Sequence, residues 1–262
     1  MYAEPVGPVL VGVDGSESAL RAVDLAAEEA AARPSPLVVV HVPGDAGADG
    51  GLLQVAATRA LAEHPGLAVS TALATGDPAD VLATWSQDAC LLVLGHHRDL
   101  SFPALPAGPV TTRVVYQSAC PVIVHRPVDA DRETAQPRPV VVGVDGDPRG
   151  EPAVEFAFEE AALRGAPLHA VHVRPWKVPD TDRTPFDAVD AWYDKYPEVP
   201  VRRYLRYGRR AVPTLAMVSA DAQLLVVSAD RCDRAPTRVV RGLVPRAMID
   251  LAGCPVAVVP LH

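Results

Sequence analysis

The chain has 262 residues and a formal net charge of −8, with 49% hydrophobic and 21% charged residues. This balance is typical of a globular protein and is too apolar for a disordered chain. The negative charge argues against sequence-independent binding to nucleic acid. At about 100–200 residues per domain, the length fits one large domain or two small ones.

Neither a targeting segment nor a membrane span is predicted. Residues 1–5 lack a basic stretch that leads into an apolar run, and no apolar run approaches the length of about 18 residues that a spanning helix needs. The chain contains no CxxC pair, and its cysteines are Cys90, Cys120, Cys232 and Cys254. We interpret them as buried thiols in a reducing compartment and expect a cytoplasmic protein.

The sequence repeats itself. Segment 9–15 reads Val-Leu-Val-Gly-Val-Asp-Gly, and segment 140–146 repeats it with one change, 131 residues later. The Cys-Pro-Val stretch at 120–122 recurs at 254–256. Preserved order and spacing indicate a tandem duplication of a unit of about 130 residues. The expected organisation is domain 1 at 1–127, a polar linker at 128–138 and domain 2 at 139–262.

Apolar runs alternate with helical patterns in both repeats. Ser16 is expected to cap a helix over 18–33, with a buried stripe of Leu20, Val23, Ala27 and Ala30. An Ala-rich helix is predicted over 53–63. The first helix of the second repeat should start near Pro152, bury Val154, Ala157, Phe158 and Ala161, and end near Gly165. Because the strand runs are continuously apolar, we predict two α/β domains with parallel, doubly wound sheets.

The repeats differ in the middle. The second has an aromatic segment, 176–200, with Phe186, Trp192, Tyr193 and Tyr196. Such a set is more often core or a pseudo-dimer interface than part of a ligand site.

Candidate binding residues gather where the strands of the first repeat end. Ligands of an open parallel sheet bind beyond the carboxyl ends of its strands. Asp14 follows the first strand, His41 ends the second, and 95–98 (Gly-His-His-Arg) follow the fourth. Gly108 opens the next helix, whose first amides would attract a phosphate.

These features resemble the universal stress protein family. The resemblance is carried by the Val-Gly-Val-Asp-Gly opening, by His41-Val42 at a strand end, by 76–79 (Gly-Asp-Pro-Ala) and by the Cys-Pro-Val closing strand, and it occurs twice. It implies five-stranded, Rossmann-like units that form an internal pseudo-dimer, with closing strands 121–125 and 255–259 at or near the seam. Further homodimerisation is left open.

One branch of that family binds ATP through a glycine, two residues, a second glycine, nine residues, and then a glycine with Ser or Thr. Gly95 and Gly108 match the first and third glycines, while Arg98 and Pro109 replace the second glycine and the Ser or Thr. The resemblance implies a nucleotide site that comprises Val13, Asp14, Gly15, Val42, Gly95, His97, Arg98, Gly108, Val110 and Thr111. Asp14 would lie near the ribose and Val42 near the adenine.

The departures have physical consequences. Arg98 adds bulk but also a charged fork that can hold phosphate, whereas Pro109 removes a hydroxyl and a backbone N–H. In the second repeat, Ser228 and Arg231 replace the first two glycines, and Gly242 comes one residue late. We therefore expect an eroded ATP motif in domain 1, with magnesium only as the nucleotide's own ion, and a more eroded one in domain 2.

A metal site is the alternative for the histidines. His41, His96 and His97 could meet Asp14, and the second repeat offers Asp145, His172 and Asp230. A strand-end imidazole bonded to the backbone is the favoured interpretation, so no metal site is predicted.

No catalytic residue is predicted either, because the chain has neither a Gly-Lys-Ser/Thr phosphate loop nor a Gly-x-Ser-x-Gly elbow. We expect a non-enzymatic regulatory or scaffold protein of the stress response with an unidentified protein partner. The alternative is an adenine-nucleotide sensor that uses domain 1 only, and slow ATP hydrolysis is left open.

Overall fold

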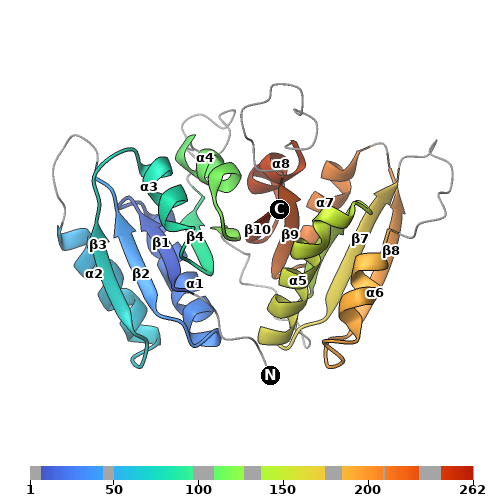
Figure 1. Ribbon diagram of the computed structural model, residues 1–262, viewed down its shortest axis with the longest axis horizontal. Coiled ribbons are helices and arrows are strands. Elements are labelled where there is room, and N and C mark those ends of the chain that lie inside the picture. The colour runs from blue at the N-terminus through green and yellow to red at the C-terminus, as the bar shows by residue number, and fades with distance from the viewer. Residues whose placement is uncertain are drawn as a thin grey trace. The chain divides into compact units, whose positions relative to one another are not determined.

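The computed structural model describes residues 7–43, 50–96, 109–126, 137–174, 185–208, 210–229 and 243–261. The chain divides into two compact units, Met1–His125 and Arg126–His262 (Figure 1). No helix of the described ranges is both long and apolar enough to span a membrane.

The first unit alternates strands and helices. In chain order they are β1 (Val9–Val13), α1 (Glu17–Ala32), β2 (Leu37–His41), α2 (Gly50–Glu63), β3 (Val69–Leu73), α3 (Pro78–Trp85), β4 (Leu91–Gly95), α4 (Pro109–Gln117) and β5 (Val122–His125). The strands pair in the order β3-β2-β1-β4-β5, and every pairing is parallel.

The second unit repeats this plan. Its elements are β6 (Val140–Val144), the 3₁₀ helix η1 (Pro148–Gly150), α5 (Glu151–Leu163), β7 (Leu168–Arg174), α6 (Asp187–Tyr193), β8 (Val201–Tyr207), α7 (Ala211–Ser219), β9 (Leu224–Ala229), α8 (Leu243–Leu251) and β10 (Val256–Pro260). Its strand order, β8-β7-β6-β9-β10, corresponds strand for strand to that of the first unit, and all pairings are parallel.

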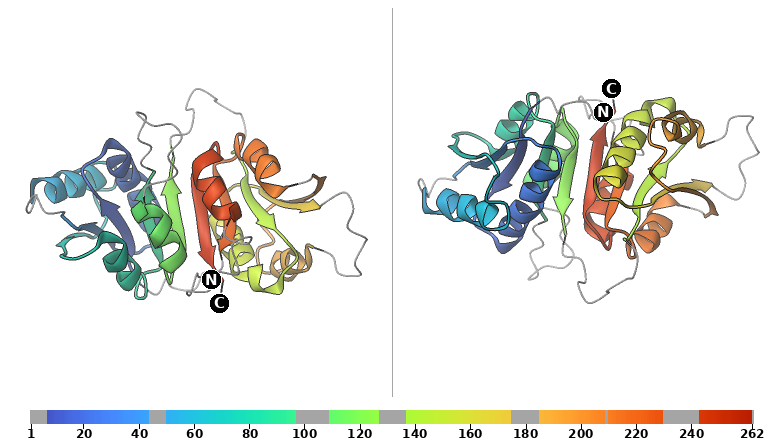
Figure 2. Two further views of the ribbon diagram at one scale, coloured as in Figure 1. Left: turned by 90° about the horizontal axis from the view of Figure 1, so that it is seen from above. Right: turned by 90° about the horizontal axis from the view of Figure 1, so that it is seen from below.

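Helices cover both faces of each sheet, which confirms the predicted doubly wound architecture (Figure 2). In the first unit, Gly12 faces Leu82 of α3, while Gly95 faces the start of α1. In the second unit, Gly143 faces Leu215 of α7, and α5 packs on the opposite face together with α6. The central strands are therefore buried on both sides, as their continuous Val and Leu runs require.

The predicted helix signals agree with the structure at most positions. The Ser16 hydroxyl accepts a hydrogen bond from the amide of Ala19 at 3.2 Å. Leu20 is only half-buried, because small alanines beside it, such as Ala19 and Ala22, form the face that packs on the sheet. In α5 the predicted stripe is buried throughout, and Gly165 follows the helix with a left-handed φ of 56°.

A buried ion pair closes the first helix of each unit. Glu29, 3% exposed, pairs with Arg33, and Glu160, fully buried, pairs with Arg164. The Arg33 guanidinium also donates to the Glu29 carbonyl at 3.2 Å, and this carbonyl accepts the backbone amide of Arg33 as well, also at 3.2 Å.

The aromatic segment is divided between core and surface. Tyr196 is buried and stacks on Phe158 with the ring centroids 5.6 Å apart. Trp192 lies beside it, at 6.4 Å, whereas Tyr193 is 44% exposed. Tyr196 therefore belongs to the core, as one of the two predicted alternatives has it, whereas Tyr193 does not.

The described cysteines are free thiols. Cys120 and Cys254 are buried and Cys90 is partly buried. Burial raises the pKa of Cys120 to about 11 and that of Cys254 to about 12, so neither is a reactive thiolate at neutral pH. Cys232 lies outside the described residues.

Candidate functional site

The described candidates Val13, Asp14 and Gly15 lie at the point where the strand order of the first unit reverses. β1 lies between β2 and β4, and Val13 stands opposite His41 in the register. Asp14 is exposed beyond β1, and its Oδ1 accepts a hydrogen bond from the amide of Ser16 at 2.9 Å. Gly15 follows with a left-handed φ of 85°, which favours glycine in this turn.

The strand-end histidines bond to the backbone. Nδ1 of His41 lies 2.7 Å from the Val13 carbonyl oxygen, and Nδ1 of His172 lies 2.8 Å from that of Val144. The same bond in both units supports the backbone interpretation over the metal interpretation. Within the described ranges, no three His, Cys, Asp or Glu side chains are placed to hold a metal ion.

Gly95 makes close contact with a helix. A Cβ atom at this position would lie 2.6 Å from the carbonyl oxygen of Ser18 and 2.7 Å from the amide nitrogen of Ala19. The absent side chain is therefore needed for β4 to pack against the first turn of α1, whether or not a ligand approaches.

The first turn of α4 supplies two further described candidates. Val110 is 36% exposed, whereas Thr111 is 7% exposed. Arg113 is engaged elsewhere, because its Nη1 donates to Asp77 at 2.8 Å and its Nη2 to Asp80 at 2.6 Å. Arg113 holds the pKa of Asp77 below its usual value. His97, Arg98 and Gly108 lie outside the described residues.

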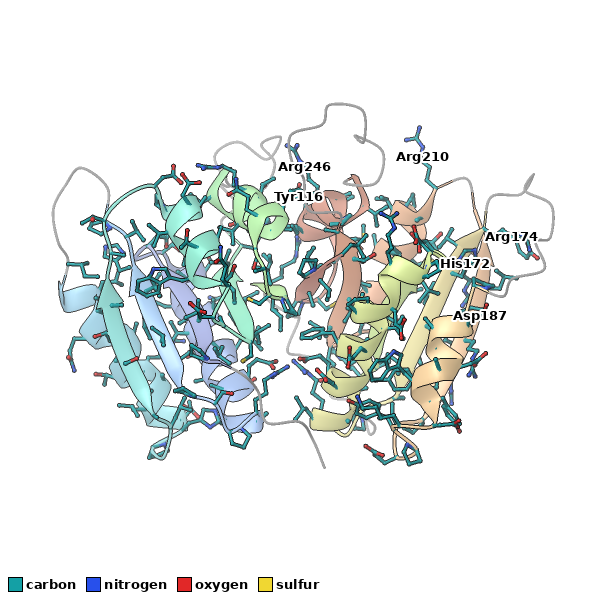
Figure 3. The ribbon with its side chains drawn as sticks, in the orientation of Figure 1. Tyr116, His172, Arg174, Asp187, Arg210 and Arg246 are labelled. Carbon is teal, nitrogen blue, oxygen red and sulfur yellow. The ribbon has the colours of Figure 1, made fainter. Side chains whose placement is uncertain are left out.

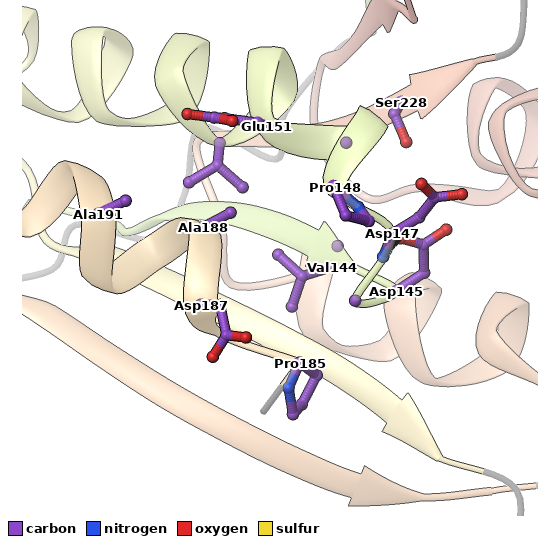
Figure 4. Close-up of a pocket in the computed structure, with 14 residues that line it drawn as sticks. Val144, Asp145, Asp147, Pro148, Glu151, Pro185, Asp187, Ala188, Ala191 and Ser228 are labelled. Carbon is purple, nitrogen blue, oxygen red and sulfur yellow. Dashed lines mark hydrogen bonds between the residues drawn. The ribbon is translucent and has the colours of Figure 1, made fainter. Parts of the chain in front are cut away.

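The second unit has a cavity of about 230 Å³ at the corresponding strand ends (Figure 4). It lies between the β6–α5 connection, the start of α6 and the end of β9. Its described lining residues are Gly143, Val144, Asp145, Gly146, Asp147, Pro148, Gly150, Glu151, Val154, Pro185, Asp187, Ala188, Ala191 and Ser228.

Four of these residues carry carboxylates, and none of the described lining residues is basic. The Asp145 carboxylate accepts from the amide of Asp147 at 2.9 Å. Arg149 donates to Asp147 at 2.7 Å and holds the pKa of that carboxyl below its usual value, so Asp147 stays ionised. Glu151 accepts from the Trp192 indole at 3.2 Å, and Asp187 begins α6 beneath the His172 strand end (Figure 3).

The sequence-based site omits the acidic lining of this cavity. Asp147, Glu151 and Asp187 lie outside the positions that correspond to the family's glycine motif. The available signal is the density of acidic residues immediately after β6, where the first unit has Ser16, Glu17 and Ser18 instead.

Fold and site together define a tandem α/β protein in which each unit has its candidate ligand site at the switch point of a parallel sheet. The universal stress protein family model matches residues 5–126 and again 137–260. The chain therefore belongs to the universal stress protein family.

Relatives share the two-unit length. A universal stress protein of Mycobacterium tuberculosis is 33% identical, over 95% of this chain and 96% of its own. A second from the same organism is 29% identical, over 84% of this chain and 85% of its own. The crystal structure of a universal stress protein from Archaeoglobus fulgidus is 17% identical, with a TM-score of 0.76 over 97% of this chain and 98% of that one, and shares the fold.

Proposed function

We propose that the chain is a non-enzymatic regulatory or scaffold protein of the cytoplasmic stress response, and that its second unit does not take nucleotide polyphosphates. The observation that carries this proposal is the lining of the second cavity, whose described residues include four carboxylates and no basic side chain.

The electrostatics oppose a polyphosphate there. Two like unit charges about 6 Å apart repel by about 3 kcal/mol at an effective dielectric constant of about 20. The Arg149 guanidinium lies beside Asp147, but none of the described residues that line the cavity is basic. The volume of about 230 Å³ is also below the roughly 300–1,000 Å³ that is common for small-molecule sites.

Thermal unfolding with and without ATP and Mg²⁺ tests this proposal. A protein whose native state binds ATP is stabilised by it, by about 2.7 kcal/mol when the ligand is at a hundred times its dissociation constant. We expect no change in the unfolding temperature at millimolar ATP. A rise of several degrees in the unfolding temperature would overturn the proposal that the chain is a scaffold that binds no nucleotide.

A second candidate is an adenine-nucleotide sensor that uses the first unit alone. It is favoured by Asp14, whose carboxylate is exposed and accepts the Ser16 amide at Oδ1, so that Oδ2 can accept a hydrogen bond from a ribose hydroxyl. In the family motif, the backbone at the second glycine contacts the phosphate. On this proposal, the Arg98 side chain makes that contact instead. An Arg98→Ala variant should then bind ATP more weakly, whereas unchanged or tighter binding would identify Arg98 as an obstruction.

A further inference from the structure

The edge strand of the second unit is strongly basic. β8 reads Val-Arg-Arg-Tyr-Leu-Arg-Tyr, and it pairs with β7 along seven residues. Its other edge has no strand partner within the described part of this unit. Arg202, Arg203 and Arg206 are all exposed. Arg210, two residues beyond Gly208, extends away from the unit (Figure 3). This is unexpected in a chain with a net charge of −8.

The two faces of β8 differ, because successive side chains of a strand point to opposite sides. Arg203 pairs with Asp190 of α6, and its guanidinium carbon lies 5.9 Å from the centre of the Tyr193 ring. This face therefore also carries Leu205 and Tyr207, which are 41% and 55% exposed.

The opposite face carries Arg202, Tyr204 and Arg206. Arg206 lies over the Tyr204 ring at 5.2 Å, and His169 of β7 contacts the same ring edge-on at 5.1 Å. Neither Arg202 nor Arg206 has a carboxylate at ion-pair distance among the described residues. Two guanidinium groups therefore lie on one face of β8, beside the open backbone edge of the strand.

The corresponding edge of the first unit lacks these features. β3 occupies the same place in the strand order, but it reads Val-Ser-Thr-Ala-Leu and pairs along five residues. Charged residues often protect an edge strand from aggregation. The shorter β3 occupies the same place without arginines, so this position in the strand order does not itself require them.

We propose that β8 docks an extended segment of a partner protein in which acidic and apolar residues alternate, by addition of a strand to the open edge. The segment's carboxylates would lie beside Arg202 and Arg206, and its apolar side chains beside Leu205 and Tyr207, since cross-strand neighbours share a face. This proposal goes beyond the nucleotide question and does not depend on it.

A single-stranded nucleic acid fits the surface less well. Beside Arg202 and Arg206 its bases would need an open aromatic ring on which to stack, but Tyr204 is half-buried and its ring already contacts Arg206 and His169. Tyr207 is 55% exposed but lies on the opposite face of the strand. An acidic peptide needs only the guanidinium groups and the backbone edge.

The test uses the full chain and a fluorescein-labelled peptide of alternating Glu and Val, about 10 residues long so that it spans β8. Fluorescence anisotropy should show binding that weakens as salt rises from about 50 to about 300 mM. A Lys-Val peptide of equal length should not bind. Neither should a Glu-Val peptide N-methylated at every amide, because neither of its edges can then donate hydrogen bonds to β8. Retained binding of the N-methylated peptide would overturn strand addition.

Charge reversal locates the site. Arg206→Glu should weaken binding of the Glu-Val peptide by about tenfold or more, and Arg202→Glu with Arg206→Glu should abolish it. Arg246→Glu is the matched control, because it reverses an exposed arginine of α8 and should leave binding unchanged. Equal effects of Arg206→Glu and Arg246→Glu would overturn the proposal. Oligo(dT) that binds more tightly than the peptide and is lost in Arg206→Glu would overturn it in favour of nucleic acid.

Discussion

Gly95 and Ser18 approach so closely that a Cβ atom on Gly95 would lie 2.6 Å from the Ser18 carbonyl oxygen. Gly95 is also the glycine that matches the first position of the family's ATP motif. One residue thus satisfies two requirements, and a glycine at this position does not by itself indicate a ligand. The packing requirement can be measured without any nucleotide.

Gly95→Ala should destabilise the protein by about 1–3 kcal/mol, the usual cost of overpacking, because the added methyl group meets backbone atoms that cannot rotate away. Urea denaturation of both proteins gives the difference. Gly66→Ala is the matched control, since nothing lies within 4 Å of a Cβ there, and it should change stability by less than about 1 kcal/mol. Equal stability of Gly95→Ala and the parent chain would contradict the contact.

The buried ion pair at the end of α1 makes a second prediction. Glu29→Ala leaves Arg33 in a nearly dry site and should cost about 3–5 kcal/mol. Replacing both residues by Met should recover most of that loss, because the uncompensated charge disappears.

A double-mutant cycle from urea denaturation separates the coupling of the two side chains from their individual effects. Glu160 and Arg164 in α5 provide an independent repeat of the experiment in the same chain. If Glu29→Ala and the double Met variant are destabilised equally, the loss does not come from leaving the Arg33 charge buried without Glu29.

Much of the fold could be predicted because it depends on local patterns that both repeats preserve. The continuous apolar strands, the Ser16 cap and the terminal Gly165 each depend on residues that are close together in the sequence. The universal stress protein resemblance added the strand number. The contact of Gly95 with Ser18, by contrast, joins β4 to α1 and leaves no local trace in either segment.

The candidate site was harder to predict, because tertiary packing brings together residues that are far apart in the sequence. Asp145 and Asp187 line one cavity although 42 residues separate them in the sequence, and only the packing of α6 beside α5 brings them together. The basic β8 edge was visible in the composition, but its significance depends on β8 being an edge strand, which the strand order decides. The predicted domain boundaries and the internal pseudo-dimer stay predictions.

Asp77 makes the stability of the first unit dependent on pH. Hydrogen bonds from Arg113, followed by those from the amides at the start of α3, lower its pKa in the folded state. A lowered pKa means that the contribution of Asp77 is complete above its unfolded value of about 3.9 and is lost as pH falls through the folded value.

Asp77→Asn should therefore lower the unfolding temperature at neutral pH, since it keeps a good cap but removes the charge partner of Arg113. The difference from the parent chain should shrink as pH falls below about 4. Unfolding temperatures measured across this range test the sign. A difference that stays constant with pH would show that the Asp77 charge contributes nothing.

Asp14 and Asp145 distinguish the two proposed functions. Both acids follow the first strand of their unit, and both accept a backbone amide two residues on, at 2.9 Å. Alanine at either position should therefore cost similar stability, which makes the two variants controls for each other. If the first unit binds ATP, Asp14→Ala should remove ATP-dependent stabilisation, whereas Asp145→Ala should retain it, because the acidic cavity behind Asp145 repels phosphate.

Calorimetric titration with ATP and Mg²⁺ measures this directly. If the chain is a scaffold without nucleotide, the parent protein and both variants should give no binding heat. Loss of binding in Asp145→Ala alone would place the nucleotide in the second unit, and would contradict the argument that four carboxylates exclude it.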